Sequence, residues 1–283
     1  MTSHSPSFFQ DHIALIDQAL KSYMSVFGSP DGILSDAIRY STLLGGKRIR
    51  PILALSTAQC VGSPLNSALA CACSIEFIHA YSLIHDDLPA MDDDTLRRGQ
   101  PTCHIAFNEA TAILAGDALQ TMAFEIIANE SSYSSDQKVL MIQNLAKASG
   151  PRGMVYGQAL DFSSMGKAID LQTLEKMHKH KTGMLIEASV MLGALTCPST
   201  VTPSELNLFK QYAQAIGLAF QVQDDILDVI SDTQTLGKTQ GADEALNKPT
   251  YPSIIGLEAS KEKLYNLHNE ALESLEKLRQ FDT

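Results

Sequence analysis

The chain has 283 residues, 45% of them hydrophobic, and a formal net charge of −11. A chain of this length and composition can bury a large core, so we expect one domain, residues 1–283, and the negative charge disfavours nucleic acid as a partner. The five cysteines, odd in number and without paired zinc-ligand spacing, are expected to pack in the core of a protein kept in a reducing cytosol. The amino terminus lacks a basic region followed by an apolar core, and no apolar stretch approaches the roughly 20 residues that span a bilayer. We therefore expect a cytoplasmic protein without membrane insertion.

Apolar residues recur at three- and four-residue spacing through much of the chain, for example at Ile13, Ile16 and Leu20, whereas strand-like alternation is scarce. We therefore predict an all-α fold, a bundle of roughly ten helices around a deep apolar cavity. Residues 67–84 and 213–230 are apolar or small nearly all round, which is typical of helices surrounded by other helices. Breaks between helices are expected at clusters of glycine, proline and serine, namely residues 28–30, 62–64, 99–101, 131–135, 150–151, 197–203 and 237–252.

Residues 45–51 combine two glycines with three cations immediately before a predicted helix. Gly45 and Gly46 allow the backbone to approach a ligand closely, and Lys47, Arg48 and Arg50 would neutralise phosphate oxygens. Taken alone, this pattern is a weak indication of a phosphate site.

An acidic cluster, residues 86–92, follows the apolar helix 67–84. Asp86 and Asp92 are six residues apart, so an unbroken helix would separate them by about 120° around its axis. Pro89 lies between them and cannot continue the helical hydrogen bonds, so we expect the chain to loosen there and Asp92 to return towards Asp86. Oxygen ligands without cysteine favour Mg²⁺ over zinc. The alternative for such an acidic run is a solvated helix end.

Two arginines follow the acidic cluster by a few residues. The guanidinium groups of Arg97 and Arg98 would lie beside a metal-bound diphosphate and bind it through paired hydrogen bonds. The adjacent Asp87 and Asp93, like Asp225 in the second cluster, are expected to orient waters or nearby Arg and Lys side chains rather than to bind metal directly.

The helix 213–230 carries a second and more regular acidic cluster. Asp224 and Asp228 lie about 40° apart around a helix, and Gln221, three residues earlier, shares their face. Mg²⁺ takes only one or two protein carboxylates and completes its shell with water and phosphate. Two such clusters at the ends of apolar helices therefore indicate a clamp for a diphosphate that carries an apolar tail.

Together with residues 157–161, 181–183, 237–238 and 247–252, these segments resemble the trans-prenyltransferases (isoprenyl diphosphate synthases), most nearly the bacterial members that make farnesyl diphosphate. The resemblance runs from about Leu34 to about Leu257 and implies an isoprenoid-synthase bundle that forms homodimers. Four residues separate the first aspartate pair from the last aspartate of the first motif, as in the bacterial type. Relatives usually continue through a last helix to a basic tail, so we expect this chain, ending at Thr283, to lack that tail.

The resemblance also implies a role for each site residue. Asp86 and Asp92 would hold two Mg²⁺ ions on the allylic diphosphate, and Asp224, assisted by Asp228, a third. Isopentenyl diphosphate would be bound by Lys47, Arg50, His79 and Arg98. The allylic diphosphate would be bound by Arg97, Lys181, Gln221 and Lys238. The predicted catalytic group is Lys181, Thr182 and Gln221, with the Thr182 hydroxyl close to the carbon that becomes cationic.

Three of these residues also have ordinary structural interpretations. From the residues alone, His79 would be a hydrogen-bonded core histidine, Lys181 part of a solvated basic face, and Gln221 the partner of a buried polar group. The resemblance reverses that order for His79 and favours a site role for Lys181. Gln221 is favoured as a site residue because it shares the face of Asp224.

The implied reaction condenses isopentenyl diphosphate with dimethylallyl diphosphate and then with geranyl diphosphate, which gives (2E,6E)-farnesyl diphosphate. Mg²⁺ and cations assist ionisation of the allylic diphosphate, the isopentenyl double bond attacks, and the departing diphosphate takes the proton. Chain length would be set one helical turn before Asp86. There, Ser82 is small and leaves the tunnel open, whereas the bulky Tyr81 would stop growth at fifteen carbons. Geranylgeranyl diphosphate is the second candidate product.

Other functions fit part of the pattern. His85 and Asp86, with His79 nearby, are compatible with an HD-type metal phosphohydrolase, which would need further histidine ligands and leaves the second cluster unexplained. A terpene cyclase shares the first motif but is expected to replace the second with a mixed Asn, Ser and Glu pattern. A helical metal-storage bundle would need Glu-x-x-His pairs on facing helices, and we expect none.

Overall fold

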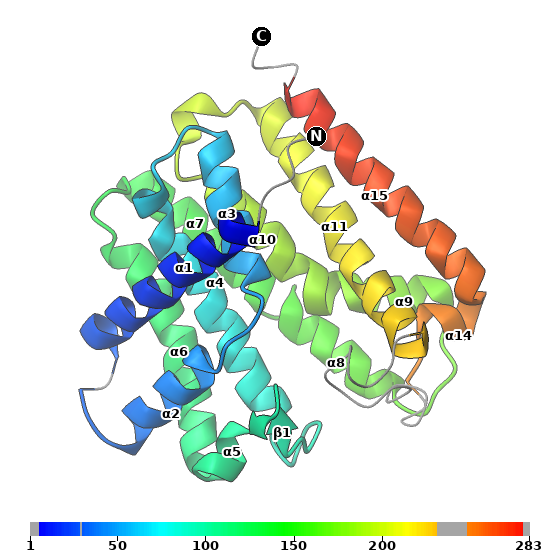
Figure 1. The fold of residues 1–283 in the computed structure, drawn as a ribbon, viewed down its shortest axis with the longest axis horizontal. Coiled ribbons are helices and arrows are strands. Elements are labelled where there is room, and N and C mark those ends of the chain that lie inside the picture. Colours follow the sequence, from blue (N-terminus) through cyan, green and yellow to red (C-terminus); the bar gives the residue numbers. More distant parts are fainter. Residues whose placement is uncertain (1–5, 29, 231–247, 280–283) are drawn as a thin grey trace. The chain divides into compact units, whose positions relative to one another are not determined.

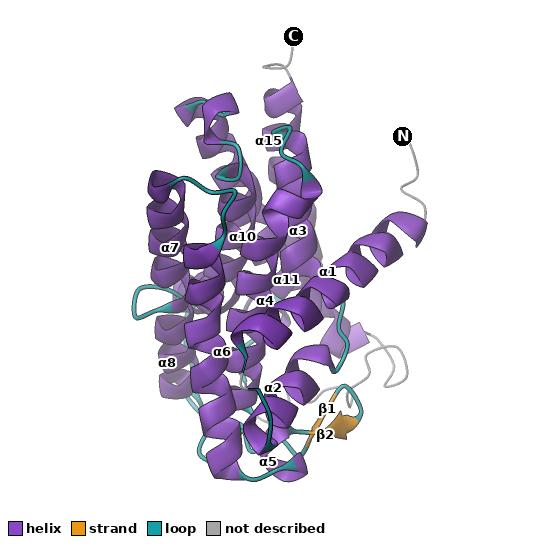
Figure 2. Ribbon diagram, turned by 90° about the vertical axis from the view of Figure 1, so that its left-hand side faces the viewer, coloured by secondary structure: helices purple, strands orange, loops and turns teal. Residues whose placement is uncertain are grey.

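The computed structural model of the 283-residue chain describes residues 6–28, 30–230 and 248–279. Within these ranges, eleven α-helices of eight or more residues account for most of the structure. The strands found there are two residues long each and form one antiparallel pair, β1 (Leu96–Arg97) with β2 (Gln100–Pro101), as Figure 2 shows. The predicted all-α fold is confirmed.

The chain separates into two compact units. Unit 1 comprises residues 1–143 and 192–198, and unit 2 comprises residues 144–191 and 199–283. The boundaries fall inside two helices, α7 (Ser135–Ser149) and α10 (Met184–Ala194). The single domain expected from the sequence stays a prediction.

Unit 1 is built around two apolar helices, α4 and α6, which pack side by side (Figure 1). Its helices are α1 (Pro6–Phe27), α2 (Ile33–Leu43), α3 (Ile49–Cys60), α4 (Leu65–Asp86), α5 (Cys103–Ala106) and α6 (Glu109–Asn129), followed by the first part of α7. Phe77 and Ile78 of α4 and Leu119 of α6 are fully buried. Since helices α2, α3 and α6 all pack on α4, its nearly continuous apolar surface is explained by its neighbours.

The sequence-based statement about membrane spans is wrong for these two helices. Both α4 and α6 are long and apolar enough to cross a bilayer by length and composition. However, 72% of the relevant α4 residues and 50% of those in α6 are buried inside the structure. The apolar residues of α4 are therefore accounted for by the core of unit 1, as expected for a soluble protein.

Unit 2 is organised by the long helix α11, which lies beside α15 along most of its length (Figure 1). Besides the last part of α7 and the first part of α10, its elements are α8 (Met154–Ser164), α9 (Leu171–His178), the π-helix η1 (Lys179–Gly183), the 3₁₀ turn η2 (Pro198–Thr200, which begins in unit 1), α11 (Pro203–Ile230), α14 (Tyr251–Ile255) and α15 (Leu257–Arg279). Leu174, Val222 and Tyr251 are fully buried in one apolar cluster. Thr250 caps α14 by accepting a hydrogen bond from the Ser253 amide, which fixes where this short helix begins.

The predicted helix breaks agree with the structure to within about two residues where it describes them, for example between α1 and α2 and between α3 and α4. Helix α14, however, begins at Tyr251, inside the predicted break 237–252. The sequence did not indicate the π-helix, because its five residues continue the helical pattern of α9 and α10. The cysteine prediction is correct for Cys71, Cys73 and Cys103, which are buried, and wrong for Cys60, which is exposed.

Candidate active site

The first acidic cluster begins where α4 ends. The Asp86 carbonyl oxygen accepts a hydrogen bond from the Asp92 amide at 2.8 Å, and the Leu88 carbonyl accepts one from the Asp93 amide at 3.2 Å. The chain thus doubles back within six residues, and the prediction that Asp92 returns beside Asp86 is confirmed for the backbone. The helix ends three residues before Pro89, rather than loosening at the proline itself.

Asp87 and Arg97 form a partly buried ion pair within this cluster. The Arg97 Nε atom lies 2.8 and 2.9 Å from the two Asp87 carboxylate oxygens, and Nη2 lies 2.5 Å from one of them. Burial raises the pKa of Asp87 above its ordinary value, although Arg97 opposes this shift. The expectation that Asp87 orients a neighbouring arginine is confirmed.

The sequence suggested that all three cations of residues 45–51 are available to a ligand, but the structure shows that one of them is buried. Lys47 is exposed and Arg50 is partly buried, but only 1% of the Arg48 side chain is exposed. Arg48 adopts the left-handed conformation with φ at 48° immediately before α3. The segment therefore offers Lys47 and Arg50 to a ligand, while Arg48 belongs to the core.

The Arg98 side chain contacts Gly45 and Gly46 of the same segment. Its Nη1 atom donates a hydrogen bond to the Gly45 carbonyl oxygen. A Cβ atom at Gly46, where φ is +129°, would lie 2.7 Å from the Arg98 guanidinium. Both glycines thus adopt positive φ angles, and Gly46 also makes room for the guanidinium of Arg98.

His79 lies in α4 near several of these cations and is partly buried. Burial lowers the pKa of His79 well below its ordinary value, and the positive charges of Arg50 and Arg98 lower it further. A neutral ring can donate one hydrogen bond, which suits a phosphate oxygen as acceptor.

We expect the His79 ring to take up its proton only at a lower pH than an ordinary histidine does. Because the unfolded chain takes up this proton near pH 6.5, above the pKa in the folded chain, the neutral ring stabilises the fold above about pH 6.5, and that stabilisation is lost as the pH falls. The measurement is an NMR titration of the histidine C2 protons, with His79→Gln identifying the resonance. A midpoint at or above about 6.5 would contradict the expectation.

Tyr81 and Ser82 lie one turn before Asp86, as predicted, but only Tyr81 is well buried, with 6% of its surface exposed. The Tyr81 ring meets the His85 ring edge to face at 5.6 Å, and the Gln120 side chain hydrogen bonds to Tyr81. Sequence reasoning missed Gln120, because this residue comes from α6 and is 39 residues away from Tyr81. The Ser82 hydroxyl is turned back to the His79 carbonyl at 2.9 Å.

In unit 2, two predicted catalytic residues are in direct contact. The Thr182 hydroxyl donates to the Gln221 side-chain oxygen at 2.7 Å, which links η1 to α11. Lys181 pairs with Asp161 of α8, with 2.5 Å between its Nζ atom and the carboxylate. The π-helix η1 carries both Lys181 and Thr182, and such local widening of a helix is frequent at functional sites. Sequence reasoning missed the role of Asp161, although it lies in the segment 157–161 already noted.

Gly157 allows α8 to approach η1 closely, because an added Cβ atom would overlap the Lys181 backbone. We expect Gly157→Ala to destabilise the protein by about 3 kcal/mol, since backbone atoms of both elements would have to move. Gly183→Ala is a matched control in η1, where an added Cβ has only ordinary contacts. Thermal unfolding followed by circular dichroism tests this, and an equal change in Tm for the two variants would contradict the close-packing argument.

The three aspartates of the second cluster have different surroundings. Asp224 is exposed, whereas Asp228 and Asp225 are 3% and 5% exposed. One Asp225 oxygen accepts the Tyr251 backbone N–H at 2.9 Å and lies 3.8 Å from His178 Nε2. Asp225 therefore anchors the start of α14, a role that sequence reasoning missed, and the expectation that it orients water, Arg or Lys stays a prediction. Lys238, the remaining predicted site residue, lies outside the described residues.

The acidic clusters suit Mg²⁺ better than a metal held wholly by protein. No group of three or more His, Cys, Asp or Glu side chains in the described part of the chain is arranged to hold a metal. Zinc and calcium sites usually need such a set, whereas Mg²⁺ binds through one or two carboxylates plus water and phosphate. Asp86 beside Asp92, and Asp224 one turn before Asp228, provide oxygen ligands of that kind.

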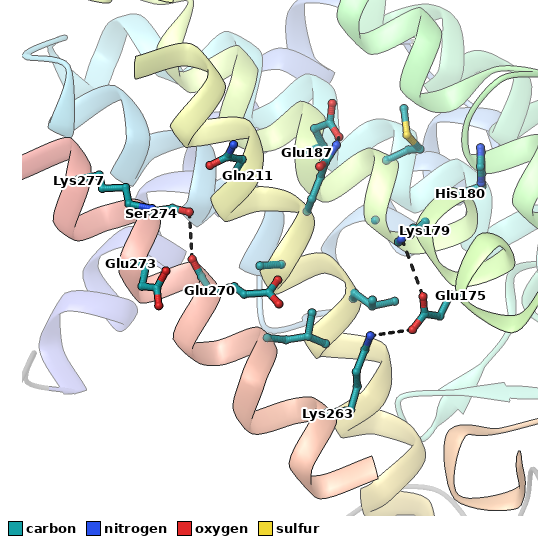
Figure 3. Close-up of a pocket in the computed structure, with 16 residues that line it drawn as sticks. Glu175, Lys179, His180, Glu187, Gln211, Lys263, Glu270, Glu273, Ser274 and Lys277 are labelled. Carbon is teal, nitrogen blue, oxygen red and sulfur yellow. Dashed lines mark hydrogen bonds and ion pairs between the residues drawn. The ribbon is translucent and has the colours of Figure 1, made fainter. Parts of the chain in front are cut away.

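A groove of about 570 Å³ on unit 2 carries none of the candidate site residues. Figure 3 shows it between α9, α11 and α15, with Glu175 paired to Lys263 at 2.9 Å and Lys179 at 4.0 Å. Its charged groups are of both signs, so it lacks the cation surplus that a diphosphate site needs.

The expectation that the sequence lacks Glu-x-x-His pairs is wrong, since Glu76 precedes His79 and Glu175 precedes His178 by three residues. In the structure, Glu76 binds Arg48 at 2.5 Å, and Glu175 binds lysines. Both carboxylates are therefore engaged with cations, and a metal-storage site of this type is not formed.

The family model for polyprenyl synthetases matches residues 31–281 of this chain. The chain belongs to the polyprenyl synthetase family. The match includes both acidic clusters, residues 45–51 and η1. Among these is the second acidic cluster, which the HD-type phosphohydrolase left unexplained. His85, the histidine on which that alternative rested, has its Nε2 atom 3.1 Å from the Ile113 carbonyl oxygen, so this nitrogen carries a proton and binds α6.

Relatives within the polyprenyl synthetase family differ in their products. Farnesyl diphosphate synthase of Escherichia coli (strain K12) is 51% identical over 264 residues, which cover 93% of this chain and 88% of that protein. Geranylgeranyl diphosphate synthase of Cyanophora paradoxa is 48% identical over 250 residues, 88% of this chain and 82% of that protein. The crystal structure of geranyltransferase from Helicobacter pylori, complexed with magnesium and isoprenyl diphosphate, has 35% identity and a TM-score of 0.84, covering 99% of this chain and 93% of that one.

Proposed function

We propose that this polyprenyl synthetase is a cytoplasmic homodimer that makes (2E,6E)-farnesyl diphosphate. It condenses isopentenyl diphosphate with dimethylallyl diphosphate and then with geranyl diphosphate. The observation that carries the proposal is the end of α4, where Asp86 and Asp92 are brought together one helical turn beyond the buried Tyr81. A charged site for the diphosphate, with the bulky Tyr81 ring one turn away, suits an allylic diphosphate whose apolar chain has a limited length.

The allylic diphosphate is proposed to bind through magnesium held by the two acidic clusters. Asp86 and Asp92 would hold two Mg²⁺ ions, and Asp224 with Asp228 would hold a third. Bound magnesium neutralises the diphosphate and makes it a better leaving group. The family relationship and the oxygen-only chemistry of the two clusters support this assignment, as does the magnesium named with the Helicobacter pylori enzyme.

Arginine and lysine side chains complete the site for the allylic diphosphate. Arg97 is held by Asp87, and Lys181 by Asp161, so neither cation has to be ordered when the substrate binds. Gln221 and Lys238 are the other proposed ligands. As the carbon to oxygen bond breaks, the oxygens of Thr182 and Gln221 face the developing positive charge and stabilise it.

Isopentenyl diphosphate is bound by a second set of groups in unit 1, namely Lys47, Arg50, His79 and Arg98. Its double bond attacks the allylic cation, and the departing diphosphate takes the proton that is lost. The neutral His79 donates a hydrogen bond without adding charge, while the three cations neutralise the diphosphate. Holding the two substrates in line and excluding water are the tasks of the protein in this step.

Geranylgeranyl diphosphate is the second candidate product, because a geranylgeranyl diphosphate synthase is also nearly half identical to this chain. Tyr81 favours the fifteen-carbon product, since its ring is fixed by His85 and Gln120 and occupies the space one turn before Asp86. The small Ser82 would favour the longer product if the neighbouring tyrosine were absent.

The test of the reaction class is to incubate the purified protein with isopentenyl and dimethylallyl diphosphates and Mg²⁺. Longer prenyl diphosphates are expected, and their formation should stop when a chelator is added. Phosphate release alone would indicate a phosphohydrolase, and a cyclic hydrocarbon would indicate a terpene cyclase. Either of these results, or no reaction, would overturn the proposal.

A further inference from the structure

We infer that Glu76, a buried carboxylate without a role in the proposed reaction, is a positioning residue for the isopentenyl diphosphate site. The inference rests on the proposed function. Glu76 lies in the middle of α4 and is 3% exposed. A buried carboxylate in an apolar helix is costly unless it is paired, so its partner is the point of interest.

The partner of Glu76 is Arg48, whose whole guanidinium group is enclosed by acceptors. The Nη1 atom lies 2.5 Å from a Glu76 oxygen, Nε lies 2.9 Å from an Asp17 oxygen, and Nη2 donates to the Thr42 carbonyl at 2.8 Å. These acceptors come from α4, α1 and α2 respectively, and Arg48 itself immediately precedes α3. One side chain thus joins four helices of unit 1.

This network fixes the backbone between the two ligand-binding cations of residues 45–51. Arg48 holds a left-handed conformation that is unfavourable for a non-glycine residue, and the buried ion pairs compensate for that cost. With Arg48 directed into the core, Lys47 immediately before it is exposed and Arg50 is only partly buried. The direction of Lys47 and Arg50 therefore depends on Arg48 being held in place.

Glu76 also connects these cations to the histidine of the same site. Glu76 and His79 are three residues apart on α4 and so lie on one face of the helix. The pair between Glu76 and Arg48 consequently sets the distance between α4, which carries His79, and the segment that carries Lys47 and Arg50. A loss of this pair should loosen the isopentenyl diphosphate site while leaving the allylic site of Arg97 and Asp87 intact.

The experiment compares Glu76→Gln with the wild-type protein. Glutamine keeps the shape and one acceptor but removes the charge that holds Arg48. We expect the KM for isopentenyl diphosphate to rise about tenfold, with the KM for geranyl diphosphate changed less than about twofold. Direct calorimetric binding of isopentenyl diphosphate should weaken by the same factor. Absence of turnover by the wild-type protein would refute the proposed function, which separates that failure from a failure of this inference.

Tyr133→Phe is the matched control for a purely structural effect. It removes a buried hydrogen bond of 2.5 Å to the Ser67 carbonyl at the start of the same helix, away from the network. An unchanged KM for isopentenyl diphosphate in Glu76→Gln, an equal rise for both substrates, or the same rise in Tyr133→Phe would overturn the inference. If Glu76→Gln does not fold, Asp17→Asn decides by the same criteria, because this second partner is 33% exposed and its loss is better tolerated.

Discussion

Asp86→Asn is expected to lower kcat by about a thousandfold or more. Asparagine keeps the size of the side chain and one oxygen ligand, but it removes the charge that attracts Mg²⁺. The leaving diphosphate would then be neutralised incompletely, so the carbon to oxygen bond would break more slowly. The measurement is the initial rate of farnesyl diphosphate formation at saturating substrates over a range of Mg²⁺ concentrations.

Asp93→Asn is the matched control, because this aspartate lies in the same turn but is exposed. Asp93 adopts a φ of 53°, a conformation that asparagine tolerates as well as aspartate does, so the backbone should be unchanged. Its kcat should stay within about twofold of the wild-type value. An equal loss in both variants would show that the general charge of the turn matters, rather than the pairing of Asp86 with Asp92.

Tyr81→Ala is expected to change the main product from fifteen to twenty carbons or more. The substitution removes the ring that occupies the space before Asp86, so a longer chain can enter. Tyr81 is well buried, and the loss of its ring should also destabilise the protein by about 3 kcal/mol, so products should be collected at low temperature. Chromatography of the dephosphorylated products gives the chain-length distribution.

Tyr81→Phe separates the bulk of the ring from its hydroxyl. This variant loses the hydrogen bond to Gln120 but keeps the contact with His85, and we expect it to make the wild-type product. A distribution that stays at fifteen carbons in Tyr81→Ala would show that another residue sets the length.

The local features of this fold were accessible from the sequence because each depends on neighbours in the chain. Helical periodicity and the clusters of glycine and proline predicted an all-α structure and most of its breaks. The return of Asp92 to Asp86 followed from one proline between two carboxylates. In the same way, the regular spacing of Asp224 and Asp228 placed both on one face of α11.

The features that sequence reasoning missed are pairs between residues far apart in the chain. Arg48 was expected to bind phosphate, yet Glu76, 28 residues later, holds it in the core. For Asp225, sequence reasoning missed the hydrogen bond from the backbone 26 residues later. A charged residue looks the same in the sequence whether its partner is a substrate or another side chain. The burial of that residue, which decides between the two, is set only by packing.

The apolar helices α4 and α6 were also misjudged from the sequence, because what covers a helix is set by packing. Both helices meet the length and composition of a membrane span, and the buried contacts between them explain why α4 is so apolar. Periodicity describes one helix at a time and does not say what covers it.

The most direct test of this account is the product of the wild-type protein at completion, with isopentenyl diphosphate in excess over dimethylallyl diphosphate and Mg²⁺ present. Geranyl diphosphate should form first and be consumed, and farnesyl diphosphate should accumulate as the end product. Accumulation of geranylgeranyl diphosphate instead, or the absence of any longer prenyl diphosphate, would contradict the assignment.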